Sequence, residues 1–133
     1  MTITANKQDL TTEDLKDFVV INDFFLTENS DQKFYALLDD KKVIGCITYI
    51  SGLAEYSHKV ASILRLEVLK NYRCRGYGSG LVRLAIQDIF SQENVDSILL
   101  RPAKKAVKFY LRLGFEVVEE GDTMMVLKRK GSI

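Results

Sequence analysis

The sequence has few of the residues that would place it outside the ordinary class of small globular proteins. Its 133 residues include two cysteines, Cys46 and Cys74, together with one proline and one histidine. Two cysteines are too few for a disulfide framework, and no apolar run reaches the length of a transmembrane helix. No signal peptide opens the chain, so we expect a reduced, cytoplasmic protein.

An excess of charge of one sign is also lacking. The formal net charge is +1, so no global field favours nucleic acid or a membrane, and we expect neither as a partner. The basic residues cluster locally instead, around 70–75, 101–112 and 128–130. With 47% hydrophobic residues, 28% charged residues and no low-complexity segment, the chain is predicted to form one domain over residues 1–133.

The strongest pattern is an apolar strand, a basic glycine-rich turn and an amphipathic helix between Ile63 and Ile89. The turn reads Arg73-Cys74-Arg75-Gly76-Tyr77-Gly78-Ser79-Gly80. Alternate glycines let the backbone fold tightly against a bulky ligand, and the first turn of a helix offers unpaired N–H groups at its positive end. The pattern predicts a phosphate site, and the alternative is a strand-to-helix turn with solvated arginines.

Neither of two standard nucleotide-binding loops fits this turn. A Walker loop requires a Lys-Ser/Thr pair after its second glycine, and a dinucleotide fingerprint requires G-x-G-x-x-G in the first strand–helix unit. The spacing here is G-x-G-x-G, and about sixty residues precede the strand. A different kind of phosphate ligand is therefore expected.

Hydrophobic periodicity predicts the remaining elements. Helices are expected over 12–27, after a capping-box-like Thr11–Asp14, over 78–92, and over 104–113, where Pro102 can begin the helix and Gly114 ends it. Strands are expected over 1–7 (weakly), 34–38, 43–51, 60–69, 96–100, 115–118 and 123–128. A strand–helix–strand unit predicts a parallel crossover, so the fold class is α/β, with a mixed (α+β) sheet.

Three further residues, Cys46, His58 and Gly45, are predicted to have mainly structural roles. Cys46 is predicted to be a small core residue and not a nucleophile, because no histidine accompanies it. His58 lies among polar neighbours and is predicted to be a surface loop residue, with general base as the minority alternative. Gly45, inside a strand pattern, marks a bulge or a close backbone approach.

Two motifs together resemble a known family. The turn Arg73-x-x-Gly76-x-Gly78 resembles the R/Q-x-x-G-x-G/A signature of the GCN5-related N-acetyltransferases (GNAT), and 65–68 is similar to their fourth strand. The stretch 106–115 is similar to their A-x-x-x-Y-x-x-x-G-F ending, about thirty residues later. The resemblance implies an acyl-CoA N-acyltransferase fold, a central mixed sheet flanked by helices. Its acceptor-side half would span about 1–60, its coenzyme-binding core about 61–118 and its C-terminal hairpin about 115–129.

The resemblance also implies a donor site for acetyl-CoA. The pantetheine arm would lie along the fourth strand and bond the backbone of Leu66 and Val68. The pyrophosphate would rest on N–H groups of the turn, and Arg73 and Arg75 would neutralise phosphates. The N–H donors implied in this way are those of Cys74, Arg75, Gly76, Tyr77, Gly78 and Ser79.

Two side chains are candidates for acid–base chemistry. Tyr110 matches the family's tyrosine, and a phenol with a pKa near ~10 suits protonation of a departing thiolate; the alternative is a core tyrosine. Glu67 is the candidate base, although simple alternation places it opposite Leu66 and Val68. An ion pair with Arg65, or an exposed strand face, would explain Glu67 without catalysis, and a water relay along backbone carbonyls is an equal alternative.

The resemblance implies an N-acetyltransferase that passes the acetyl group to a primary amine directly, in a ternary complex, without a metal. The amine belongs to a small molecule or a protein, and acidic 119–122 either attracts a cationic amine or is an ordinary turn. The family's asparagine is replaced by Ala103, and the N-terminal half has one evident helix where many relatives have two. The pocket is thus open or completed by a second subunit, and the alternative function is a non-catalytic acyl-CoA-binding sensor or partner subunit.

Overall fold

The structure is a computed structural model that describes residues 1–5, 10, 32–51, 59–119 and 123–130. Its strands are β1 (Thr2–Thr4), β2 (Gln32–Asp39), β3 (Lys42–Ser51), β4 (Val60–Val68), β5 (Ser97–Leu100), β6 (Glu116–Val117) and β7 (Met125–Lys128). Its helices are α2 (Tyr77–Phe90) and α3 (Val107–Arg112), with the 3-10 turns η3 (Lys70–Tyr72) and η4 (Lys104–Ala106).

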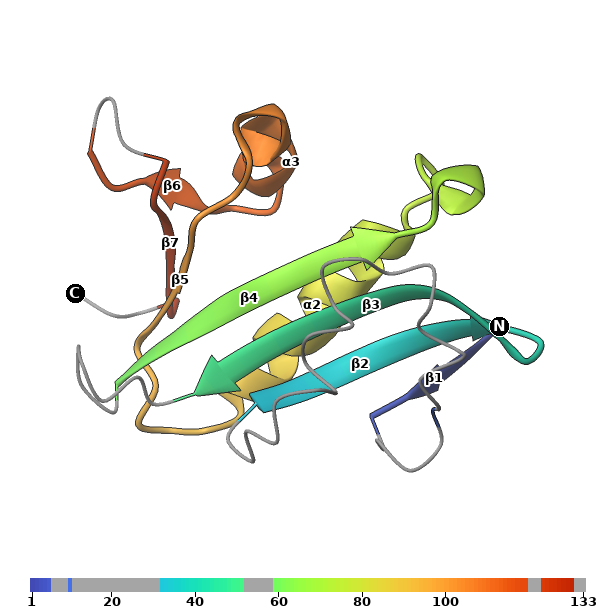
Figure 1. The fold of residues 1–133 in the computed structure, drawn as a ribbon. Helices are drawn as coiled ribbons and strands as arrows, with labels where there is room; N and C mark the ends of the chain where they lie inside the picture. Colours follow the sequence, from blue (N-terminus) through green and yellow to red (C-terminus); the bar gives the residue numbers. More distant parts are fainter. Residues whose placement is uncertain (6–9, 11–31, 52–58, 120–122, 131–133) are drawn as a thin grey trace.

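The strands form one mixed sheet in the order β1-β2-β3-β4-β5-β7-β6 (Figure 1). Among the described strands, only β4 and β5 pair in parallel, and α2 is the crossover between them. All other neighbours are antiparallel. The predicted mixed sheet and its parallel pair are therefore confirmed.

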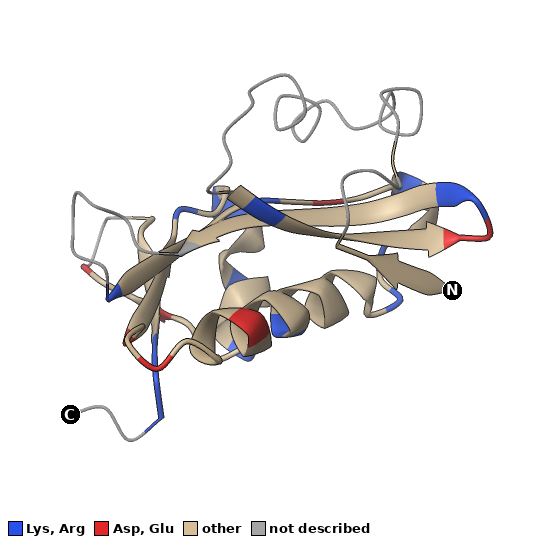
Figure 2. Ribbon diagram, turned by 90° about the horizontal axis from the view of Figure 1, so that it is seen from below, with Lys and Arg blue, Asp and Glu red and all other residues tan. Residues whose placement is uncertain are grey.

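The helix α2 covers one face of β2, β3 and β4, as the edge-on view of the sheet shows (Figure 2). Leucine, valine, alanine and isoleucine recur on one side of α2, and four of them are buried: Leu81, Val82, Ala85 and Ile89. They pack against Ile44, Ile47 and Tyr49 of β3 in the larger core cluster. The predicted apolar stripe of this helix is thus confirmed.

A smaller apolar cluster lies among the side chains that alternation sends to the opposite face. It contains Phe34 and Ala36 of β2 with Val43 and Cys46 of β3. Cys46 is fully buried, and this burial, followed by the nearby charge of Glu67, raises the pKa of its thiol to about 12. The prediction that Cys46 is a core residue is confirmed, because a protonated buried thiol is a poor nucleophile.

Gly45 marks both a bulge and a close approach, as the sequence suggested. Leu37 pairs with Gly45 and Leu38 with Val43, so Ile44 is an extra residue on β3. A Cβ at position 45 would lie 3.2 Å from Cδ1 of Leu81. The missing side chain therefore lets α2 pack closely on β3.

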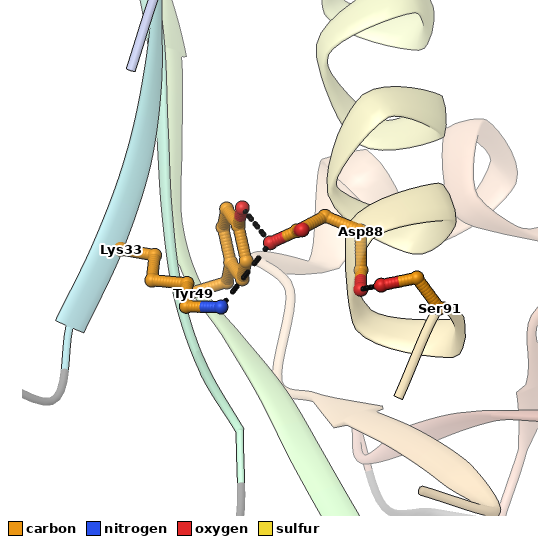
Figure 3. A network of polar contacts seen from close by, with 4 residues as sticks. All are labelled: Lys33, Tyr49, Asp88 and Ser91. Carbon is orange, nitrogen blue, oxygen red and sulfur yellow. Dashed lines mark hydrogen bonds and ion pairs between the residues drawn. The ribbon is translucent and has the colours of Figure 1, made fainter. Parts of the chain in front are cut away.

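A polar network fastens the C-terminal half of α2 to the sheet (Figure 3). The hydroxyl of Tyr49 donates a hydrogen bond to Oδ2 of Asp88 over 2.6 Å, and Nζ of Lys33 lies 3.5 Å from the same oxygen. Burial and the bond to Asp88 raise the pKa of Tyr49, because both disfavour the phenolate. The carboxylate of Asp88 thus provides a hydrogen-bond acceptor for the buried hydroxyl of Tyr49.

Arg129, just after β7, is expected to be a large contributor to stability. Its Nε donates to the carbonyl of Val95 over 2.9 Å, its Nη2 donates to the carbonyl of Gln92 over 2.7 Å, and its guanidinium stacks 4.9 Å from the ring of Phe90. Arg129→Ala should lower the free energy of unfolding in urea by about 2–3 kcal/mol. Arg129→Lys should restore less than half, because an ammonium cannot reproduce the planar fork. A lysine variant as stable as the native chain would contradict this assignment.

Some predicted boundaries are wrong by a few residues. The strand expected over 1–7 covers only Thr2–Thr4, and those expected over 115–118 and 123–128 are shortened to β6 and β7. Pro102 does not begin a helix, since η4 starts at Lys104 and regular α-helix only at Val107. Gly114 does end α3, with φ +99°. The helix predicted over 12–27, His58 and most of the acidic turn at 119–122 lie outside the described residues.

Candidate functional site

The two parallel strands diverge to form a cleft. The pairing of β4 with β5 extends only from Val60 with Ser97 to Ser62 with Leu99. Beyond these residues β5 ends at Leu100, and Pro102, which has no N–H to donate, follows shortly after. The second half of β4 therefore has no parallel neighbour on this side.

A bulge in β4 lies where the strands separate. Arg65 pairs with Thr48 and Ile63 with Tyr49, so Leu64 is an extra residue on β4. The bulge shifts the alternation of the strand by one residue. Before it the odd-numbered Ala61 and Ile63 belong to the larger core cluster, and after it the even-numbered Leu66 and Val68 pack against that cluster. A bulge also twists and bends its strand, which explains the divergence.

The cleft has a volume of about 390 Å³ and lies between β4, η4 and α3. Its lining residues come from the ends of both parallel strands and from the helix that follows: Ile63, Leu64, Arg65, Leu66, Leu100, Arg101, Pro102, Ala103, Lys105, Ala106, Phe109 and Tyr110. Leu66 and Tyr110, both singled out from the sequence, are brought together here. Glu67 is not part of the described lining.

The backbone of β4 offers unpaired groups to this cleft. The amide of Leu69 donates to the carbonyl of Ile44 over 2.9 Å, which marks a hydrogen-bonded position of the β3–β4 ladder. Because such positions alternate, Glu67 turns its backbone groups toward β3, whereas Leu66 and Val68 turn theirs away. An extended ligand in the cleft would therefore meet the N–H and C=O groups of Leu66.

The glycine-rich turn folds into the start of α2. Cys74 and Gly76 both have left-handed backbone conformations, with φ 63° and 85°, and Gly76 is the N-cap residue. No side chain caps the helix, and its first turn contains no acidic residue. The first bond within the helix joins the amide of Gly80 to the carbonyl of Gly76 over 3.0 Å. The preceding amides thus point outward at the positive end of the helix, as an anion site requires.

The two arginines of the turn behave differently. Nε of Arg73 donates to the carbonyl of Val68 over 2.8 Å, so this side chain ties the turn back to the end of β4. The guanidinium of Arg75 lies 5.7 Å from the centre of the Tyr72 ring, and both arginines are exposed at the surface. Arg73 therefore has a structural role in addition to its positive charge.

Gly78 joins the turn to the cleft. A Cβ there would lie 3.6 Å from Cζ of Phe109 and 3.9 Å from Cδ2 of Leu66. The start of α2, the second half of β4 and α3 thus meet at one point. No local pattern in the sequence distinguishes Phe109 from an ordinary apolar residue of a helix.

Tyr110 is 6% exposed and lies against Phe109 and Phe115, with ring centroids 4.9 and 5.6 Å away in edge-to-face geometry. Burial raises the pKa of its phenol to about 12. The hydroxyl is therefore a proton donor at neutral pH. It is a core residue and a cleft residue at once, so the two interpretations drawn from the sequence are not exclusive.

Glu67 lies on the opposite face of β4 from Leu66 and Val68, as simple alternation predicts. It pairs with Cys46 across the sheet, and its Oε1 is buried without a hydrogen-bond partner among the described residues. In the same part of the chain no ion pair joins it to Arg65, so that explanation of the two charges is wrong.

Two kinds of feature are absent from the residues that the structure describes. No three histidine, cysteine, aspartate or glutamate side chains in this part gather as a metal site. Within the same residues, no helix is both long and apolar enough to cross a membrane.

Comparisons with known proteins agree with this geometry. Residues 4–115 match the model of the acetyltransferase (GNAT) family, whereas no curated protein matches the chain. Among solved structures, Arabidopsis thaliana NAA60 in complex with a bisubstrate analogue is 21% identical, with 98% of this chain and 100% of that chain covered and a TM-score of 0.74.

Two further solved structures are similar. AtaTR bound with AcCoA is 23% identical over 96% of this chain and 92% of that one, with a TM-score of 0.76. AtaT complexed with acetyl-methionyl-tRNAfMet is 20% identical over 96% and 94%, with a TM-score of 0.73. These likenesses concern the fold, and the family match spans most of the sequence. The chain belongs to the GNAT acetyltransferase family.

Proposed function

We propose that this protein moves an acetyl group from acetyl-CoA to a primary amine by direct transfer, with both substrates bound at once. The observation that carries the proposal is the cleft between the diverging strands β4 and β5, which opens beside the unpaired amides at the start of α2. Acetyl-CoA supplies the acetyl group as a thioester and leaves as the thiol. The chain's own part is to hold the donor, place the amine and move protons.

The donor is proposed to lie along β4. The backbone of Leu66 and Val68 would form hydrogen bonds with the pantetheine arm, as an added strand would. The carbonyl of Val68 also accepts a hydrogen bond from Nε of Arg73. The amides from Cys74 to Ser79 would bind the pyrophosphate, which fits the left-handed geometry of the turn and the absence of acidic residues there. Arg75 would neutralise a phosphate with its exposed guanidinium.

Tyr110 is proposed to protonate the departing thiolate. Its burial and raised pKa keep the phenol neutral, and its position in the cleft lining brings it beside the backbone of β4. A neutral phenol next to a developing thiolate can donate its proton, and the amine's proton leaves by another route.

Glu67 is proposed to accept the amine's proton through a water molecule. A water is needed because Glu67 does not belong to the described cleft lining, while its buried Oε1 still has an open acceptor site among the described residues. Glu67→Gln is expected to lower kcat about tenfold and leave the KM for acetyl-CoA unchanged. A variant with native kcat would show that backbone carbonyls and water carry the proton instead.

The fold alone does not choose the acceptor. One structural relative is described with acetyl-methionyl-tRNAfMet and another with a bisubstrate analogue. We propose a small amine or a protein amine as the acceptor, with a second copy of the chain completing the acceptor side of the pocket. We place the reaction in the cytoplasm, since the exposed free thiol of Cys74 suits a reducing compartment.

Thiol release from acetyl-CoA in the presence of a panel of primary amines tests the activity. We expect release that depends on the amine and saturates with both substrates, with intersecting double-reciprocal lines. Parallel lines would instead indicate an acetylated enzyme. Tight acetyl-CoA binding without transfer to any amine would favour a non-catalytic sensor or partner subunit.

A further inference from the structure

Cationic side chains line the cleft and a cavity that shares residues with it. Arg65 and Arg101 line both the main cleft and an adjoining cavity of about 210 Å³, and Lys105 lines the main cleft. None of the described residues that line either cavity is acidic. The charged residues of the described linings are therefore all basic, although the whole chain has a net charge of only +1.

Arg65 has open hydrogen-bonding capacity. Its Nη1 donates to the carbonyl of Leu64 over 3.0 Å, and it forms no ion pair with any residue that the structure describes. The side chain is exposed and projects from the bulge of β4. A guanidinium with free N–H groups is well suited to bind a carboxylate or a phosphate through two parallel bonds.

Arg65 and the pyrophosphate site lie at separate positions along β4. Arg65 precedes Val68 by three residues, roughly 10 Å at ~3.3 Å per residue. The amides at the start of α2 lie beyond Val68. A donor that runs along β4 from that turn would bring its thioester, and not its phosphates, toward Arg65.

The positive charge continues on the surface beside the cleft. From η4 to the end of α3 the exposed charged side chains are all basic: Lys104, Lys105, Lys108 and Arg112. Glu67 lies two residues from Arg65 on β4, and Glu116 and Glu119 follow α3, but none of the three belongs to either described lining. An anionic molecule that approached the cleft past η4 and α3 would therefore meet mainly basic side chains.

We infer that the acceptor is an amine with an anionic group, a carboxylate or a phosphate, a few atoms from its nitrogen, and that Arg65 binds this group. The inference rests on the proposed function, because it concerns the acceptor of that same reaction. It opposes the alternative that acidic 119–122 attracts a cationic amine. Arg101, which lines both cavities, and Lys105, which lines the main cleft, are the other basic residues of the described linings.

Anion binding is tested first, without turnover. Inorganic phosphate is titrated into the protein saturated with coenzyme A, which occupies the phosphate site of the turn, and binding is followed by NMR. Arg65→Gln should weaken phosphate binding about tenfold. Arg83→Gln, which removes the same charge from an exposed position of α2 outside both cavities, should bind like the native chain. Equal phosphate binding by all three proteins would overturn the inference.

Matched acceptors then identify the anion. Phosphoethanolamine is compared with ethanolamine, β-alanine with β-alaninamide, and spermidine is the cationic acceptor. The native enzyme should favour at least one anionic member over its neutral partner about tenfold in kcat/KM, and Arg65→Gln should remove that preference without changing the KM for acetyl-CoA. Which pair shows the preference distinguishes phosphate from carboxylate.

Failure of the inference differs from failure of the proposed function. If neutral or cationic amines react as well as the anionic ones, the anionic acceptor is wrong and the acetyltransferase stands. If the native chain binds no acetyl-CoA, the proposed function is wrong. The phosphate titration of native and Arg65→Gln chains would still test the anion site in that case.

Discussion

Replacement of Gly78 by glutamate is expected to lower the affinity for acetyl-CoA by about a hundredfold or more. The amide of Gly78 belongs to the outward-pointing set at the start of α2, and a Cβ there would grow toward Phe109 and Leu66. A carboxylate at this point would repel the pyrophosphate, and opposed like charges cost several kcal/mol in a binding site. Calorimetric titration with acetyl-CoA measures the loss.

Two variants separate charge from shape in this experiment. Gly78→Gln adds nearly the same volume without the charge and should lose less affinity than Gly78→Glu. Gly80→Ala is the control outside the site, because its position is open and its amide already bonds the carbonyl of Gly76. That alanine should keep native affinity and raise the free energy of unfolding by about 0.5–1 kcal/mol. Native affinity in a folded Gly78→Glu protein would refute the phosphate assignment.

Replacement of Tyr110 by phenylalanine is expected to lower kcat by about a hundredfold with little change in either KM. The ring contacts with Phe109 and Phe115 survive the change, so the variant loses a proton donor and keeps its packing. Steady-state kinetics with the best amine of the panel measures this. A loss confined to the KM for acetyl-CoA would show that the hydroxyl binds the donor and does not protonate the thiolate.

The pH dependence supplies a second test of Tyr110. Its pKa in the folded protein is about 12 and the usual value is ~10, so the folded state holds this proton more tightly. The corresponding stability, about 2–3 kcal/mol, is present below pH ~10 and is lost as the pH rises to ~12. Between pH ~10 and ~12 the free energy of unfolding of Tyr110→Phe should therefore fall less than that of the native chain. Identical alkaline unfolding of both proteins would contradict the burial of an ionisable phenol.

Much of the sheet could be predicted because its signals are local. The stripe from Leu81 to Phe90 repeats at helical spacing, and the strands around β2 and β3 are bounded by turn residues, so these elements appear at nearly the predicted places. The ends of the short C-terminal strands could not be predicted. Their length depends on pairing: β7 pairs with β6 on one side and with β5 on the other, and the pairing with β5 joins residues far apart in the sequence.

The candidate site, like the sheet, could be predicted from the sequence only in part. The phosphate turn was visible because glycines recur at alternate positions, although the left-handed conformations fall at Cys74 and Gly76 and not at Gly78 or Gly80. The bulge at Leu64 has no local signal in the sequence. It depends on register with β3, and it determines that Leu66 and Arg65 both reach the cleft. Glu67 could be placed on the other face because it follows simple alternation after that bulge.

The central claim is that acetyl-CoA lies along β4 with its phosphates on the start of α2. Amide hydrogen exchange of the native chain, with and without saturating acetyl-CoA, tests it most directly. The account predicts added protection at 64–68, 74–79 and 101–110, and unchanged exchange in β1, β2 and the C-terminal half of α2. Protection elsewhere, or no change in any of these three stretches, would contradict it.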